Sequence, residues 1–178
     1  MRMTDGCAFA ILRHMGDEQI IKGLQEKLLA KIRGGAVCGP FMAAIYDRDG
    51  NCLAEAANSV TATNCSHNHA EMNAIRQAEE RLGTWDLAPK DLTLYTTSEP
   101  CMMCLGGILW SGIRKVVYGV PTERVEAIGG FDEGFKPGWK EEFARRKIEV
   151  VGPLAEAEGE AVLREYARLA KTVYVPKR

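Results

Sequence analysis

Three residues of metal-binding types stand at two points of the 178-residue chain. His69 begins the run His-Ala-Glu, and Cys101 and Cys104 are three residues apart in Pro-Cys-Met-Met-Cys. On the first turn of a helix two such cysteines point the same way, and a helix N-terminus stabilises the thiolates that a metal needs. One histidine and two cysteines with no obvious fourth ligand are typical of a catalytic zinc site that keeps an open position. We therefore expect one Zn²⁺ per chain at His69, Cys101 and Cys104.

Glu71 lies two residues after His69 and would stay free beside the metal, because zinc prefers imidazole and thiolate ligands. A free carboxylate in that place can take a proton from activated water and pass it on. His-x-Glu followed by Pro-Cys-x-x-Cys is the pattern of zinc deaminases that act on nucleobases. Glu71 is therefore predicted to be catalytic.

Two other interpretations of the cysteines remain open. A Cys-x-x-Cys pair after a strand can be a thiol-redox site, although that leaves His-Ala-Glu unexplained. A structural zinc module would need a fourth ligand, which Cys65 or His67 could supply. A closed site of that kind would give Glu71 no task.

Composition limits the remaining possibilities. Hydrophobic residues make up 46% and charged residues 26% of the chain, as in ordinary soluble domains, and the formal net charge is −1. This charge gives no polyanion-binding signature, so a nucleic-acid polymer is an unexpected partner. No apolar run reaches membrane-spanning length, and the start lacks a convincing signal peptide. Of the six cysteines, the four outside the metal motif show no framework spacing, which indicates reduced thiols, so we expect a cytoplasmic protein.

Apolar periodicity and turn residues predict an alternation of elements. Residues 61–68 are expected to form a loop and residues 121–138 to be irregular. The order predicts a single α/β deaminase domain over residues 1–178, a three-layer α/β/α sandwich with a mixed five-stranded sheet and helices on both faces. Residues 1–16 would be an N-terminal extension and 172–178 a C-terminal tail. Helices are expected over 17–33, 69–82, 101–111, 140–147 and 156–171, and strands over 41–47, 52–60, 91–97, 115–120 and 148–151.

The predicted helix over residues 101–111 carries no charged residue on any side. A helix that is apolar all round is expected to be buried all round. In a domain of this size the sheet would cover one side and a partner subunit the other, so the sequence predicts a homodimer.

The two metal motifs resemble those of the cytidine-deaminase-like zinc hydrolase superfamily. A closer resemblance, to its guanine deaminases, rests on Gly39-Pro40-Phe41, on Asn58, on Trp110-Ser111-Gly112 and on the run from Ile128 to Phe135. It spans roughly residues 17–176. Transfer RNA adenosine deaminases share the two zinc motifs but look less similar after Val120. The resemblance implies a five-stranded sheet between helices, zinc at the three ligands named above, proton transfer by Glu71 and a homodimer.

The same resemblance implies roles for further residues. Asn58 and the backbone of Ala70 would bind the base, and Tyr174 would close the pocket from the tail. Glu133 falls where some guanine deaminases carry aspartate, which makes it the second predicted catalytic carboxylate. Side chains that would shape the pocket, stack on the base or otherwise bind it are Phe41, Trp110 and Asp132.

Each of these side chains also has a purely structural explanation. Asn58 could close a turn, Phe41 could belong to the core, and Trp110 could belong to the dimer interface. Tyr174 could simply dock the tail. Asp132 and Glu133 could be solvated acids in a glycine-rich loop.

The hypothesis is a zinc-dependent hydrolytic deaminase of a free purine base, with guanine converted to xanthine and ammonia. A carboxylate at Glu133 is an acceptor-only group that suits the adjacent N1–H and 2-amino donors of guanine. Because glutamate is one methylene longer than the aspartate of relatives, guanosine and a triazine such as ammeline remain alternatives. The wobble adenosine of transfer RNA is the next alternative substrate after these two.

Overall fold

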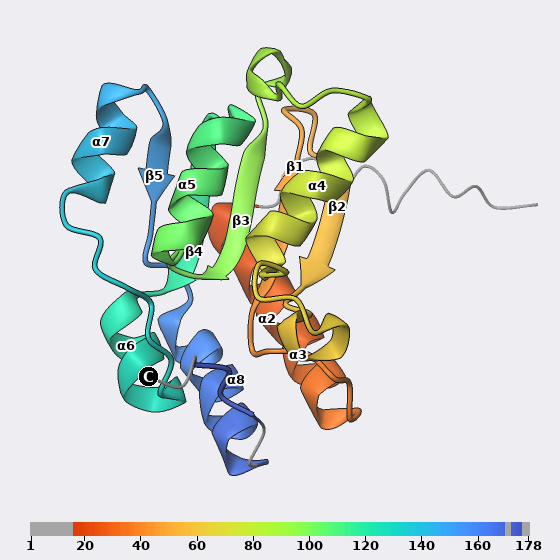
Figure 1. The fold of residues 1–178 in the computed structure, drawn as a ribbon, viewed down its shortest axis with the longest axis vertical. Helices are drawn as coiled ribbons and strands as arrows, with labels where there is room; N and C mark the ends of the chain where they lie inside the picture. The colour runs from red at the N-terminus through yellow and green to blue at the C-terminus, as the bar shows by residue number, and fades with distance from the viewer. Residues whose placement is uncertain (1–15, 170–171, 176–178) are drawn as a thin grey trace, which may run out of the picture.

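The computed structural model describes residues 16–169 and 172–175, and Figure 1 shows a central sheet with helices packed against it. Residues 1–15 of the predicted N-terminal extension lie outside the described residues. The same holds for residues 170–171 of the last predicted helix and for residues 176–178 of the predicted tail.

The sheet has five strands in the order β2-β1-β3-β4-β5. Strand β1 pairs antiparallel with β2 and with β3, whereas β3, β4 and β5 are parallel. The predicted mixed five-stranded sheet is therefore confirmed. The strands are β1 (Met42–Tyr46), β2 (Cys52–Ala57), β3 (Thr93–Ser98), β4 (Lys115–Val120) and β5 (Glu149–Val151).

Helices occupy the stretches that periodicity predicted, and three further short helices of the described chain, one of them a 3₁₀ helix, lie where it predicted none. Most of α3 falls in the expected loop, and α6 falls in the expected irregular stretch. None of the helices in the described part of the chain is long and apolar enough to cross a membrane. The helices are α2 (Asp17–Arg33), α3 (Val60–Thr63), α4 (Ala70–Leu82), the 3₁₀ helix η2 (Ala88–Lys90), α5 (Met102–Ser111), α6 (Thr122–Gly129), α7 (Trp139–Arg145) and α8 (Glu156–Arg168).

Two apolar cores lie on opposite faces of the sheet, and the alternation of side chains along β1 separates them. Ala43 and Ile45 join the core beneath α4, α5 and α7, whereas Met42 and Ala44 join the core beneath α2, α6 and α8. Each core contains buried residues from the helices on its own side. The predicted three-layer arrangement is therefore confirmed.

Close approach of α8 to the sheet depends on Gly159. A Cβ added there would collide with the Val120 side chain and with the amide of Gln25. The carbonyl of Val120 accepts a hydrogen bond of 2.8 Å from the Glu99 backbone N–H. Helix α8 therefore packs against the end of β4, and this strand end is hydrogen-bonded to Glu99, two residues before Cys101.

Helix α5 is buried on one side only within a single chain. Leu105 and Ile108 are buried, but Met102, Met103 and Trp110 are 52%, 37% and 86% exposed. The inner side of α5 is therefore covered as predicted, and its other side is open in a single chain. The predicted homodimer, which would cover the exposed side, stays a prediction.

Candidate active site

The metal-ligand types meet where two neighbouring helices begin. His69 precedes the first residue of α4 and Cys101 precedes the first residue of α5, each with an extended backbone. The Nδ1 atom of His69 lies 3.5 Å from the Cys101 sulfur and 3.6 Å from the Cys104 sulfur. The three ligand atoms lie within 4.8 Å of one another, and no second cluster of this kind occurs among residues 16–169 and 172–175.

These distances fit a shared Zn²⁺. With zinc–sulfur bonds of about 2.3 Å and zinc–nitrogen bonds of about 2.0–2.1 Å at tetrahedral angles, nitrogen and sulfur ligands should be about 3.6 Å apart. The Cys65 sulfur contacts His67 Nδ1 at 3.7 Å, and neither residue joins the cluster. The geometry therefore matches three protein ligands, as in a catalytic site, and not the four of a structural module.

The two cysteines of the cluster have pKa values that are shifted in opposite directions. The hydrogen bond from Cys104 lowers the pKa of Cys101 to about 4, with help from His69, so this sulfur is a thiolate at neutral pH. The same hydrogen bond and burial raise the pKa of Cys104. Burial has the largest single effect and lowers the pKa of His69, but the hydrogen bond to Cys101 and the negative charges around the ring together outweigh it and raise the pKa overall. The cluster thus holds a negative sulfur that favours a cation.

Glu71 lies in the first turn of α4, is 5% exposed and has both carboxylate oxygens engaged. Oε1 accepts a hydrogen bond from the Thr96 hydroxyl at 3.2 Å, and Oε2 accepts one from the Cys104 thiol at 3.5 Å. Burial raises the pKa of Glu71, and the negative charge of Cys101 adds to the effect. A carboxyl group with a raised pKa next to a metal cluster suits proton transfer near neutral pH.

A cavity of about 470 Å³ opens beside the cluster. This volume is in the range of small-molecule sites. Its walls come from separate parts of the chain, namely the residue before β1, the segment of α3 and the loop after it, the starts of α4 and α5, the loop after α6, and the tail. Among the lining residues are Phe41, His69, Glu71, Cys101, Glu133 and Tyr174.

Glu133 is 9% exposed and lies on the loop after α6. Its backbone N–H donates to Glu126 Oε1 at 3.3 Å, and its carbonyl accepts from the Met102 N–H at 3.2 Å. Burial raises the pKa of Glu133 to about 8; the charges of Cys101 and Glu71 add to the effect and Lys136 opposes it. Glu133 is therefore a second buried carboxyl group at the cavity, not a solvated acid.

Asp132 also lines the cavity but is exposed, and its Oδ1 accepts a hydrogen bond of 3.1 Å from the Gly134 N–H. This contact shapes the turn of the loop. The structure thus brings both predicted loop acids to the cavity and gives them different surroundings.

Aromatic rings form one wall of the cavity. The Phe41 and Phe131 ring centroids are 5.0 Å apart, and those of Phe131 and Tyr174 are 5.2 Å apart. The Tyr166 hydroxyl donates to the Thr172 carbonyl at 2.7 Å, which fixes the tail that carries Tyr174. Phe131 is a lining residue that the sequence prediction missed, although an apolar residue in a glycine-rich polar stretch was a signal for it.

Asn58 lies next to the cavity but not among its lining residues. It is 1% exposed, and its Oδ1 accepts a hydrogen bond of 3.2 Å from the Val60 N–H. A Cβ added at Gly39 would meet both Asn58 Oδ1 and the Tyr174 hydroxyl. Within the described chain, Asn58 Nδ2 and the Tyr174 hydroxyl are buried without a hydrogen-bond partner. Unpaired buried groups are rare, and a polar ligand would satisfy them.

Two predicted binding residues lie away from the walls of the cavity. Ala70, the first residue of α4, is fully buried and does not line it. Trp110 is nine residues after Cys101, which is about 13 Å along a helix axis. It is 86% exposed, so the structure does not bring it to the bound-ligand position that the resemblance implied. Its place fits the other interpretation, a contact surface.

Comparison with known proteins agrees with this geometry. Residues 19–120 match the family model of the cytidine and deoxycytidylate deaminase zinc-binding region. Guanine deaminase of Bacillus subtilis is 46% identical over 98 residues, which are 54% of this chain and only 60% of that protein's length. The tRNA-specific adenosine deaminase of Bacillus subtilis is 33% identical over 153 residues, which are 85% of this chain and 89% of that protein.

Solved structures show the same architecture. A guanine deaminase from Nitrosomonas europaea superposes with a TM-score of 0.80 at 32% identity, covering 94% of this chain and 96% of that one. The protein NE0047 in complex with 2,6-diaminopurine gives a TM-score of 0.82 at 33% identity, covering 98% and 96%. The predicted cytidine-deaminase-like fold and its likeness to guanine deaminases are therefore confirmed. The chain belongs to the cytidine and deoxycytidylate deaminase zinc-binding family.

Proposed function

We propose that the protein is a zinc-dependent hydrolytic deaminase of a free purine base, with guanine and water giving xanthine and ammonia. The observation that carries the proposal is that Glu71 and Glu133 line one cavity together with His69 and Cys101 of the histidine–cysteine cluster. It is supported by similarity to NE0047, whose structures are in complex with 2,6-diaminopurine and 8-azaguanine.

Glu133 would select the base. Ionised, it offers two acceptor oxygens, and guanine presents N1–H and its 2-amino group as adjacent donors. Adenine presents an acceptor at N1, which would face a negative charge. Donors on the bound base stabilise the ionised form, so guanine would lower the pKa that burial has raised to about 8.

Zinc held by His69, Cys101 and Cys104 would supply a Lewis acid that lowers the pKa of water towards neutrality. Glu71 would take the proton of the attacking water and transfer it to a ring nitrogen of the base. A bond from C2 to oxygen forms, and the bond from C2 to the amino group then breaks. As that bond breaks, Glu71 would take the remaining proton from the oxygen now bound to C2 and give it to the departing amine, so the C2 carbonyl forms, ammonia leaves and the carboxylate returns to its starting state.

The remaining wall residues would hold the base and exclude water. The rings of Phe41 and Phe131 can pack on a planar heterocycle, and the unpaired Nδ2 donor of Asn58 suits an acceptor atom of the base. Tyr174 would close the cavity from the tail. Trp110 has no part in binding under this proposal, because it lies at the far end of α5.

A transfer RNA adenosine deaminase is the second candidate, because one such enzyme is 33% identical over 85% of this chain. Two observations count against it. The net charge of −1 is unfavourable for binding a polyanion, and Glu133 is mismatched to N1 of adenine. Guanosine and ammeline remain alternatives with a matching donor pattern.

An ammonia-release screen over guanine, guanosine, adenine, cytosine, ammeline and transfer RNA tests the proposal. Guanine should be the fastest substrate, and Glu133→Gln should lower its turnover by about a hundredfold or more, with zinc content unchanged. Glu141→Gln, an exposed acid on α7, is the matched control and should have no effect. Deamination of transfer RNA but not guanine would overturn the assignment, as would near wild-type turnover by Glu133→Gln.

A further inference from the structure

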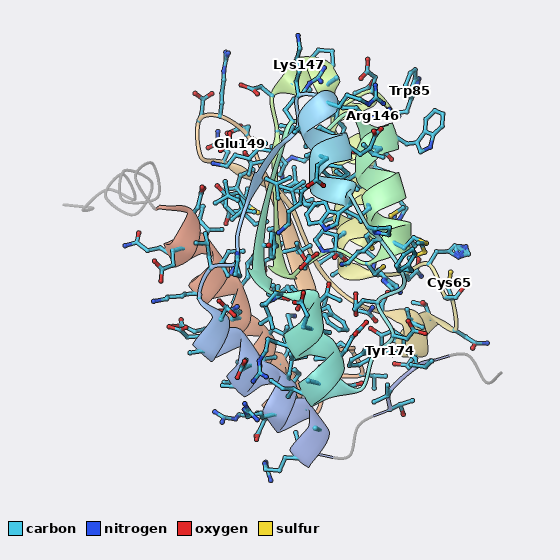
Figure 2. All side chains as sticks on the ribbon, turned by 90° about the vertical axis from the view of Figure 1, so that its left-hand side faces the viewer. Cys65, Trp85, Arg146, Lys147, Glu149 and Tyr174 are labelled. Carbon is cyan, nitrogen blue, oxygen red and sulfur yellow. The ribbon has the colours of Figure 1, made fainter. Side chains whose placement is uncertain are left out.

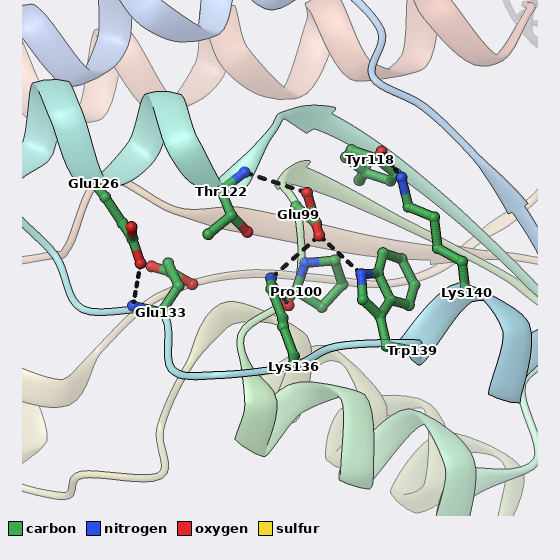
Figure 3. Close-up of polar contacts among 9 residues, drawn as sticks. All are labelled: Glu99, Pro100, Tyr118, Thr122, Glu126, Glu133, Lys136, Trp139 and Lys140. Carbon is green, nitrogen blue, oxygen red and sulfur yellow. Dashed lines mark hydrogen bonds and ion pairs between the residues drawn. The ribbon is translucent and has the colours of Figure 1, made fainter.

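A buried ion pair joins the loop that carries Glu133 and Lys136 to Glu99 at the end of β3 (Figure 3). The side chains of Lys136 and Glu99 are 8% and 9% exposed, and Lys136 Nζ lies 3.4 Å from Glu99 Oε1. Lys136 Nζ also donates to the Pro100 carbonyl at 2.6 Å. Lysine is almost never fully buried unless it is paired, since its ammonium group loses hydration there. These two acceptors therefore hold Lys136 inward at the residue before Cys101.

Glu99 connects this lysine to the rest of the fold. Its Oε1 accepts a hydrogen bond from Trp139 Nε1 at 3.0 Å, and its Oε2 accepts one from the Thr122 N–H at 3.2 Å. Thr122 begins α6 and Trp139 begins α7, so one carboxylate ties the first residues of both helices to the end of β3. An ionised acceptor with three donors around it is well stabilised despite its burial.

The loop between α6 and α7 is also held at Glu133, by hydrogen bonds of its backbone to α6 and to the start of α5. The Glu133 N–H donates to Glu126 and its carbonyl accepts from Met102, so both backbone groups are held. After Glu133 the chain turns at Gly134, which has a φ of +79°, and passes Phe135, which is 81% exposed. Because the Phe135 side chain is exposed, it does not hold the loop against the rest of the protein. On the C-terminal side of Glu133 the loop is held by the contacts of Lys136.

We propose that Lys136, through Glu99 and Pro100, is a positioning residue that fixes the Glu133 loop to the start of α5. The inference rests on the proposed role of Glu133 in binding the base. Because Met102 and Pro100 flank Cys101, the anchor makes the substrate-binding carboxylate and the cysteine cluster one rigid unit. Lys136 itself does not line the cavity, so it acts through the placement of Glu133.

Lys136→Met tests this, because it keeps most of the length of the side chain and removes the charge and the donor. Lys140→Met is the matched control: Lys140 is four residues further on and donates to the Tyr118 hydroxyl at 2.8 Å instead. Hydrogen exchange of the Met102 amide, which donates to the Glu133 carbonyl, reports on the loop without requiring activity. We expect exchange about tenfold faster or more in Lys136→Met and within twofold of wild type in Lys140→Met.

Catalytic activity should fall in the variant whose Glu133 loop is less well held. For Lys136→Met we expect kcat/KM for guanine to fall about tenfold to a hundredfold, weaker binding of 8-azaguanine and unchanged zinc content. The double variant Lys136→Met with Glu99→Gln removes both buried charges, so its unfolding midpoint should recover relative to Lys136→Met. Exchange at Met102 and kcat/KM should not recover, because the link to Pro100 is still missing.

Two results would overturn the proposal. One is exchange at Met102 and kcat/KM in Lys136→Met that match those of Lys140→Met. The other is recovery of exchange and activity together with stability in the double variant, which would mean that Lys136 only neutralises a buried charge. If the wild-type protein deaminates no guanine, the proposed function fails, while the exchange comparison still decides whether Lys136 anchors the loop.

Discussion

In the metal-free protein Glu71 lies beside the ligands, and its two oxygens accept hydrogen bonds from Thr96 and Cys104. Zinc prefers imidazole and thiolate ligands, so we expect Glu71 not to be one of them. Glu71→Ala should therefore keep about one zinc per chain and lose turnover by about a hundredfold to ten-thousandfold, the scale of a lost acid–base group. Metal analysis and ammonia release on the same sample measure both. Cys101→Ala is the contrasting variant and should lose metal and activity together. Loss of zinc from Glu71→Ala would show that this carboxylate is a ligand.

Glu133 gives the metal-free protein a pH dependence whose direction is fixed. Its pKa is raised from 4.5 to about 8, so between these values the folded state keeps a proton that the unfolded state has lost. The contribution of Glu133 to stability is therefore present below about pH 4.5 and is lost as the pH rises to about 8. Glu133→Gln cannot ionise, so it should be more stable than wild type at pH 8 by on the order of 4 kcal/mol, and nearly equal at pH 4.5.

Urea unfolding of both metal-free proteins at several pH values measures this difference. Glu141→Gln serves again as the control, and its difference from wild type should not change with pH. A constant difference between Glu133→Gln and wild type would mean that Glu133 is solvated in the folded protein.

Residues with local signals could be identified from the sequence, and residues with long-range roles could not. The spacing of Cys101 and Cys104 and the start of a helix at His69 depend on neighbours in the chain, so the metal cluster was predictable. Phe131 and Lys136 gain their roles when the loop folds back on the start of α5, and Lys136 contacts a carbonyl 36 residues earlier in the chain. No spacing rule describes such contacts.

At the scale of the elements, the close packing of α8 against β4 at Gly159 can be tested by a substitution. Gly159→Ala would drive a Cβ into the branched side chain of Val120, which is 1% exposed, so we expect a loss of about 1–3 kcal/mol in the free energy of unfolding. Gly23→Ala in α2 is the matched control, because a Cβ there meets no atom of the described structure within 4 Å. It should leave stability unchanged or raise it by about 0.5–1 kcal/mol. Equal midpoints in denaturant would contradict this account of α8.

The helices that the sequence did not predict are short and bury little. Helix α6 has eight residues and one buried residue, Val125, so no apolar period was visible. Its boundaries did carry signals, because it begins after Pro121 and is followed by the capping residue Gly130, which has a φ of +72°. Helix α2, with six buried positions, was predicted to the residue, and the predicted starts of α4 and α5 were one residue too early.

For the molecule as a whole, the exposed side of α5 predicts the assembly state. Trp110, Met102 and Met103 are exposed on a helix without charges, and we expect a second copy of the chain to cover them. Trp110→Glu should shift sedimentation from dimer to monomer at micromolar concentration. Trp85→Glu changes an equally exposed tryptophan that lies outside α5, and should leave the dimer intact. A monomeric wild-type protein would refute the prediction.

Figure 2 shows Tyr174 and Trp85 towards opposite ends of the molecule. Tyr174 lines the cavity, whereas none of residues 83–85 in the turn after α4 does, and that turn is exposed or partly exposed. That separation makes the turn a natural attachment point. A fluorescent domain or a surface tether inserted there should leave guanine turnover intact, so that the enzyme could be immobilised as a working sensor with its cavity facing the solution.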